Sequence, residues 1–120
     1  MEKENIIAEK SKAFAIRIIR MYQFLTTEKK EFIMSKQLLR CGTSIGANVR
    51  ESIYGQSRPD FHTKLTIALK EAAETEYWLE LLFETNYITD EQYNSIANDC
   101  KELLKILTAI TKQTKRIRNE

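Results

Sequence analysis

Hydrophobic residues recur along most of this chain at intervals of three and four positions, with polar residues between them. This is the period of an α-helix that buries one face. Short polar stretches interrupt the pattern, which therefore predicts four helices, over about residues 3–25, 31–55, 59–86 and 90–117. Because the connections are short, consecutive helices should run antiparallel. We expect an all-α fold, a single domain over residues 1–120 that forms an up-down-up-down four-helix bundle.

The apolar stripes also predict the core and the helix ends. Gly55 suits a C-terminal cap, Pro59 suits a first helical turn, and Thr89 with Gln92 matches a capping box. Asn86 is expected to end the third helix. The expected core residues are Ile7, Phe14, Ile18, Met21, Leu25, Leu38, Gly42, Ile45, Val49, Ile53, Phe61, Leu65, Ala68, Ala72, Leu79, Phe83, Ile96, Cys100, Leu103, Leu107 and Ile110.

The segment 38–52 departs most from an ordinary helix sequence, because it mixes glycine, serine and asparagine with apolar residues. Gly42 and Gly46 lie one turn apart, so another helix can approach this backbone closely. The polar residues of this segment flank its apolar face. Glu76 lies at the edge of the apolar stripe of the third helix, and an acid buried there needs a hydrogen-bond partner. We expect a structural polar network that fixes helix register, formed by Arg40, Ser44, Asn48, Glu51 and Glu76. A general acid–base role for Glu76 is the less favoured alternative.

The apolar surface exceeds what one bundle core requires. Apolar residues of the first and third helices point away from the expected core, and exposed apolar patches of this kind usually mark an interface. We therefore predict a homo-oligomer whose interface contains Ile16, Ile19, Ile67, Trp78 and Leu81.

Composition narrows the class of protein. Hydrophobic residues make up 42% of the chain, with three glycines and one proline, which favours long helices over disorder. There is no signal-peptide pattern and no apolar run near 18 residues, so a cytoplasmic location without membrane contact is expected. Cys41 and Cys100 are expected to be buried free thiols.

Catalytic and metal motifs are missing from the sequence. A di-iron bundle needs Glu-x-x-His on two helices, whereas this chain has a single histidine, His62. No phosphate-binding loop, dinucleotide fingerprint or nucleophile elbow occurs. We expect no enzyme activity, no metal and no cofactor.

Charge is unevenly distributed, although the net charge is only +2. Residues 70–102 carry 2 basic and 9 acidic side chains, whereas residues 103–120 carry 5 basic and 1 acidic. Four basic side chains of the fourth helix, Lys101, Lys105, Lys112 and Arg116, fall within about 60° of one another, opposite its core face. Lys115 and Arg118 extend the charge at the C-terminus. Such a row can bind nucleic acid through the phosphate backbone without reading bases. The candidate nucleic-acid-binding residues are Lys101, Lys105, Lys112, Lys115, Arg116 and Arg118.

Two segments resemble a known family. Residues 38–51 match the pattern L-L-R-x-G-x-S-I-x-A-N-x-x-E of the bacterial four-helix-bundle proteins encoded in intervening sequences of 23S ribosomal RNA genes, and residues 68–79 match that family's second block. The chain departs from the pattern at Cys41 and Arg50, where small residues are common. The resemblance implies a ring, with a homopentamer favoured. A related branch resembles the accessory variability proteins of retroelements, basic rings that engage nucleic acid and a reverse transcriptase.

These observations favour a non-catalytic, oligomeric nucleic-acid-binding protein. The ribosomal RNA context of the family favours RNA, although the residues themselves do not distinguish RNA from DNA. The alternative is a protein-interaction scaffold that uses the acidic surface of the third and fourth helices, including Glu74, Glu80 or Glu84, to bind a protein partner.

Overall fold

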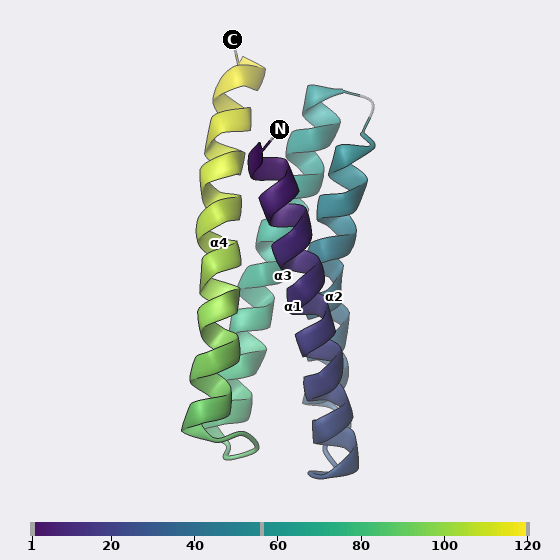
Figure 1. Ribbon diagram of the computed structural model, residues 1–120, viewed down its shortest axis with the longest axis vertical. Coiled ribbons are helices and arrows are strands. Elements are labelled where there is room, and N and C mark those ends of the chain that lie inside the picture. Colours follow the sequence, from purple (N-terminus) through teal and green to yellow (C-terminus); the bar gives the residue numbers. More distant parts are fainter. Residues whose placement is uncertain (1, 56, 120) are drawn as a thin grey trace.

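The computed structural model describes the backbone of residues 2–55 and 57–119 and the side chains of residues 6–55 and 57–115. Within these residues the chain forms four helices and no strands. The helices pack side by side into a body of 50 × 21 × 21 Å (Figure 1). Their bounds are Glu2–Thr27 (α1), Met34–Ile53 (α2), Arg58–Glu84 (α3) and Asp90–Asn119 (α4).

The connections between helices lie at alternate ends of the molecule. Figure 1 shows the α1–α2 and α3–α4 connections at one end and the α2–α3 connection at the other. Helix α1 packs on α2 and α4, and α3 packs on the same two helices. The α1–α4 seam is the most sparsely packed of the four.

The core follows the predicted stripes closely. Phe14, Ile18, Leu38, Leu79 and Leu107 are among its largest fully buried side chains. The exceptions lie toward the ends and edges of the bundle. Met21, Phe61 and Phe83 are only partly buried, and Ile53, the last residue of α2, is exposed.

The predicted turns around α3 and α4 are confirmed, and their hydrogen bonds show how each helix ends. Asn86 has a φ of 70°, and the N–H groups of Asn86 and Tyr87 donate to the carbonyls of Phe83 and Leu82, which is a Schellman motif. The Thr89 hydroxyl accepts from the Gln92 N–H while the Gln92 amide oxygen accepts from the Thr89 N–H. This reciprocal pair is the predicted capping box.

The ends of α2 differ from the prediction. Tyr54, rather than Gly55, is the C-terminal cap, and no described glycine has a positive φ. The helix begins at Met34 and not near residue 31, because Glu31 caps it from outside. Phe32 and Ile33 therefore lie in the connection, where both are exposed.

The two glycines of α2 permit the close helix approach that their spacing predicted. A Cβ atom at Gly42 would lie 2.7 Å from Ile18 Cγ1, and one at Gly46 would lie 3.2 Å from the Ser11 carbonyl oxygen. Both neighbours belong to α1. Larger residues at these positions would force α1 away from α2.

Candidate nucleic-acid interface and polar seams

A row of lysines runs along the outer face of α4. Lys101, Lys105 and Lys112 are exposed and fall within about 40° of one another at 100° per residue. They span roughly 16 Å of helix, at 1.5 Å per residue. Lys115 is exposed one turn further on. The side chains of Arg116 and Arg118, which we also predicted to bind nucleic acid, lie outside the described residues.

Two acidic side chains of the same helix, Asp99 and Glu102, pair with α1. The Arg17 guanidinium donates to Asp99 Oδ2 at 2.6 Å and to the Ser95 hydroxyl at 2.8 Å. Lys10 forms an ion pair with Glu102 at 3.2 Å. In the described part of the chain no ion pair involves a lysine of the α4 row. The row therefore keeps its full positive charge toward solvent.

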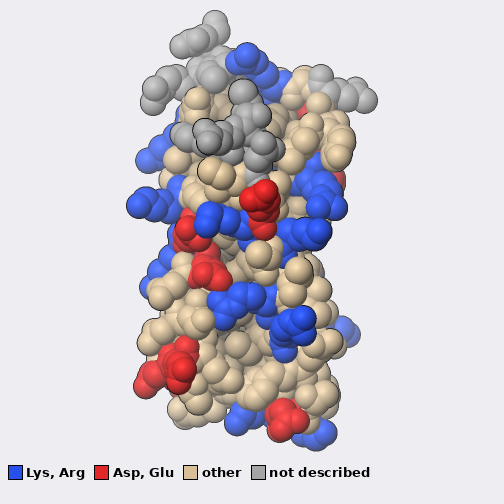
Figure 2. Space-filling model, in the orientation of Figure 1, with Lys and Arg blue, Asp and Glu red and all other residues tan. Residues whose placement is uncertain are grey.

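Figure 2 shows this distribution on one face of the molecule. Lysine and arginine side chains project from the upper left edge, where Figure 1 places α4. Acidic side chains lie nearer the middle of this face and at its lower left edge. The protein thus presents basic surface along the upper part of α4 despite its small net charge.

The predicted polar residues of α2 line its seam with α3, where they form separate pairs. Arg40 forms ion pairs with Glu71 and Glu74, and the Trp78 indole N–H donates to Glu74 at 2.9 Å. In the next turns Asn48 donates to the Ser44 hydroxyl at 3.2 Å. Further along, Lys64 pairs with Glu51 at 2.8 Å. The Asn48–Ser44 contact lies within α2, so only the ion pairs of Arg40 and of Glu51 cross the seam, and these residues do not form one connected network.

Glu76 does not join these residues. No described hydrogen bond or ion pair links it to α2, and Arg40 reaches Glu71 and Glu74 instead. Burial raises the pKa of Cys100 on α4 to about 12, and the nearby Glu76 carboxylate adds to that increase. Burial raises the pKa of Tyr93, also on α4, and the Glu80 and Glu76 carboxylates add to the increase. Glu76 therefore lies on the side of α3 that faces α4.

The residues predicted to form the oligomer interface differ in exposure. Ile16, Ile19 and Ile67 are 45%, 41% and 36% exposed. Trp78 is only partly buried against the core, and Leu81 is half-buried. All five keep some apolar surface at the outside of the bundle, on α1 and α3.

A buried carboxylate organises the α1–α2 connection, which sequence reasoning missed. Glu31 accepts hydrogen bonds from the backbone N–H groups of Ile33, Met34 and Ser35, at 3.0, 2.9 and 2.7 Å. Burial alone would raise the pKa of Glu31, but these hydrogen bonds outweigh it and hold the pKa below its ordinary value. Lys30 sits beside it with a strained φ of 53°.

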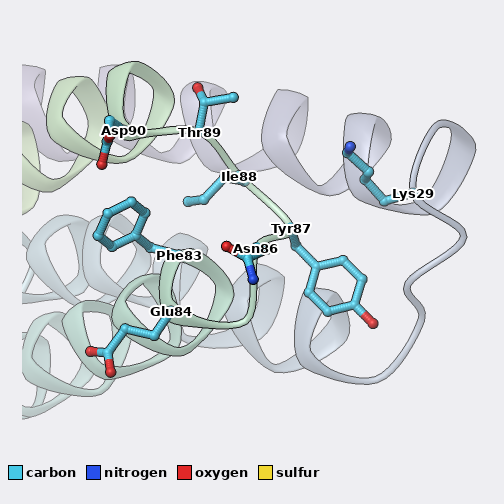
Figure 3. Close-up of a pocket in the computed structure, with 8 residues that line it drawn as sticks. All are labelled: Lys29, Phe83, Glu84, Asn86, Tyr87, Ile88, Thr89 and Asp90. Atoms are coloured by element: carbon cyan, nitrogen blue, oxygen red, sulfur yellow. The ribbon is translucent and has the colours of Figure 1, made fainter.

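An open hollow of about 550 Å³ lies at the same end of the bundle. Figure 3 shows its lining, which comes mainly from the end of α3 and the α3–α4 connection, with Lys29 across from them. Phe83 also stacks on Tyr93, with ring centroids 4.5 Å apart. The lining residues are Lys29, Phe83, Glu84, Asn86, Tyr87, Ile88, Thr89 and Asp90.

The remaining reactive side chains have structural contacts. Cys41 and Cys100 are buried free thiols, as predicted. Thr75 donates to the Cys41 sulfur, and the Cys100 thiol donates to the Ala72 carbonyl. His62 contacts the Thr114 hydroxyl at 2.7 Å through Nδ1. Over the described residues, no group of three metal-ligating side chains converges.

The hydropathy of the four helices shows whether any of them could cross a membrane. Across the residues described, none of them is both long enough and apolar enough to span a bilayer.

Comparisons with known proteins identify relatives over nearly the whole chain. The 23S rRNA-intervening sequence protein family matches residues 3–109. The chain is similar to a crystal structure of a protein with unknown function from the S23 ribosomal protein family of Bacteroides thetaiotaomicron VPI-5482. The two chains are 62% identical, with a TM-score of 0.90, over 92% of this chain and 98% of the other. No curated protein matches the chain.

Proposed function

The chain belongs to the 23S rRNA-intervening sequence protein family, and from this premise we propose that it is a non-catalytic nucleic-acid-binding protein. RNA is the favoured ligand, held through its phosphate backbone. The bundle, with its consecutive helices antiparallel, acts as one subunit of a homo-oligomeric ring in the cytoplasm, and five subunits are the favoured number.

The exposed lysine row of α4 carries this proposal. Lys101, Lys105 and Lys112 have no ion pair among the described residues, while Asp99 and Glu102 of the same helix are paired with α1. Binding phosphates releases condensed counterions, which favours association without base contacts. No exposed aromatic side chain belongs to the described part of this row, so base stacking is not invoked.

The ring would supply the affinity that one subunit lacks. Three or four lysines on a single exposed helix bind a polyanion weakly. Several copies bound to one strand act at a high effective concentration, which increases the overall affinity. The exposed isoleucines of α1 and α3 support such self-association.

A protein scaffold is the second candidate. Glu80 and Glu84 on α3 are exposed and have no ion pair in the described part of the chain. Glu74 is instead paired with Arg40, which makes it less available to a partner. The acidic surface supports an interaction with a basic protein.

Titration of labelled single- and double-stranded RNA and DNA at increasing salt separates the two functions. Backbone binding predicts that affinity falls steeply between about 50 and 200 mM salt, with little dependence on base sequence. Absence of binding at the lowest salt would favour the scaffold.

A further inference from the structure

The α1–α2 connection presents two apolar side chains to solvent at one end of the bundle. Phe32 is 59% exposed and Ile33 is 80% exposed. We call this pair the 32–33 knuckle. Lys30 and Lys36 flank it, both exposed and without an ion pair in the described residues.

The backbone holds the knuckle in a fixed position. The Glu31 carboxylate binds the N–H groups of Ile33, Met34 and Ser35, and the Ser35 hydroxyl donates to the Glu31 carbonyl at 2.8 Å. Lys30 adopts a left-handed φ that costs energy for a non-glycine residue. A connection held this firmly loses little entropy when its exposed side chains bind a partner.

The hollow at the α3–α4 connection has the complementary character. Phe83, Tyr87 and Ile88 supply the apolar part of a lining that is otherwise polar (Figure 3). Glu84 and Asp90 belong to its lining and are exposed, and neither has an ion pair among the described residues. Lys29 is the one cation of the described lining, so the two carboxylates outnumber it and the hollow favours an apolar group that is flanked by cations.

We infer that the 32–33 knuckle of one subunit docks in the hollow of the next, as part of the ring interface. The inference rests on the ring of the proposed function and adds a contact to the α1 and α3 isoleucines. Ile33 and Phe32 lie against Phe83 and Tyr87 of the next copy. Lys30 and Lys36 lie near its carboxylates.

The positions of the two features along the bundle allow this contact to be repeated in a ring. Knuckle and hollow lie at the same end of the bundle, on the α1–α2 and α3–α4 connections (Figure 1). The contact is heterologous, since different surfaces meet, and such contacts form rings when repeated rotation closes. Side-by-side subunits related by rotation about an axis along the bundle keep every knuckle level with a hollow.

The test is the mass of the assembly in the absence of nucleic acid. Light scattering behind a sizing column should show that Phe32→Asp with Ile33→Asp shifts the wild-type oligomer to the 14.1 kDa subunit. The helical circular dichroism should stay unchanged, because both side chains are exposed. The matched control is Ile53→Asp with Tyr54→Asp, since these residues are 45% and 80% exposed at the opposite end. The control should keep the wild-type mass.

A charge exchange tests the polar part of the contact. Lys36→Glu and Glu84→Lys should each weaken subunit association roughly tenfold, because like charges then face one another. The double variant should recover most of the loss. A knuckle variant that keeps the wild-type mass, or a wild-type protein that is monomeric, overturns the inference. If the oligomer responds to these variants as expected but wild-type protein binds no nucleic-acid probe, the proposed nucleic-acid function is wrong and the inferred subunit contact still holds.

Discussion

Arg17 of α1 holds Asp99 of α4 through a 2.6 Å hydrogen bond, and the same guanidinium reaches the Ser95 hydroxyl and carbonyl. This contact bridges the most sparsely packed seam of the bundle. It also turns an acidic side chain of α4 toward α1. Arg17 thus stabilises the α1–α4 seam and also pairs with a negative charge of α4, the helix that carries the proposed binding face.

Replacing Arg17 should weaken the α1–α4 seam. Arg17→Met keeps much of the aliphatic contact and removes the charged hydrogen bonds. The expected cost is about 1 kcal/mol, because the pair is partly exposed but makes several bonds. Urea unfolding measures the change. Lys10→Met, which breaks the single ion pair to Glu102, is the control and should cost less; an equal cost would contradict a special role for Arg17.

Gly46→Leu should destabilise the bundle, because a Cβ there already lies 3.2 Å from the Ser11 backbone oxygen. Overpacking of this kind typically costs about 1–3 kcal/mol. Ala47→Leu places the same side chain one residue later, on an exposed position, and should change stability by less than about 0.5 kcal/mol. Thermal unfolding of the two variants compares them directly. Equal stability would mean that α1 does not pack closely on Gly46.

Glu31 should make the stability of the protein depend on acid pH. Its pKa is lowered on folding, so it stabilises the native state above the ordinary carboxyl pKa near 4.5, and this contribution is lost as pH falls through the lowered value. Glu31→Gln should cost about 1–2 kcal/mol at pH 7, by analogy with the loss of a helix cap. The difference from wild type should shrink below pH 4. Glu28→Gln, at an exposed position, should show no such difference.

The cysteines should be unreactive in the native protein. Burial raises the pKa of Cys41, and it raises that of Cys100 to about 12. At pH 8 the Cys100 thiolate is then roughly a thousandfold scarcer than that of an unperturbed thiol. A thiol reagent should label both residues only on unfolding. Rapid labelling of the native protein would show that the core around these two cysteines, where α2 and α4 contact α3, opens readily.

Most of the fold was predictable from the sequence, because apolar periodicity and the turn chemistry of Asn86 and Thr89 act locally. The start of α2 was not predictable in the same way. Glu31 caps that helix from two residues before its N-cap, Ile33, and glutamate is not a usual capping residue. The prediction therefore placed Phe32 and Ile33 in a helix, whereas the structure places them in an exposed connection.

The polar contacts between helices could not be predicted, because the sequence pattern does not give the relative rotation and position of neighbouring helices. Glu71, Glu74 and Glu76 occupy one stretch of α3, yet only the first two face Arg40. Successive residues turn by 100°, so a few positions decide which neighbouring helix an acid meets. The pairing of Arg17 with Asp99 likewise required the relative positions of α1 and α4. The exposure of the α4 lysines, by contrast, followed from their place opposite the core stripe.

The most direct measurement compares two triple charge reversals for nucleic-acid binding. One variant changes Lys101, Lys105 and Lys112 to glutamate, and the control changes Arg50, Arg58 and Lys70, which are exposed on α2 and α3 without described ion pairs. The net charge is the same in both, so only the position of the change differs.

Fluorescence anisotropy with labelled single-stranded RNA at about 50 mM salt gives the affinities, and light scattering confirms that each variant keeps the wild-type mass. Counterion release predicts that the α4 variant loses affinity by roughly a hundredfold or more, while the control stays much closer to wild type. If both variants lose affinity equally, or the α4 variant binds as tightly as wild type, the lysine row of α4 is not the nucleic-acid interface.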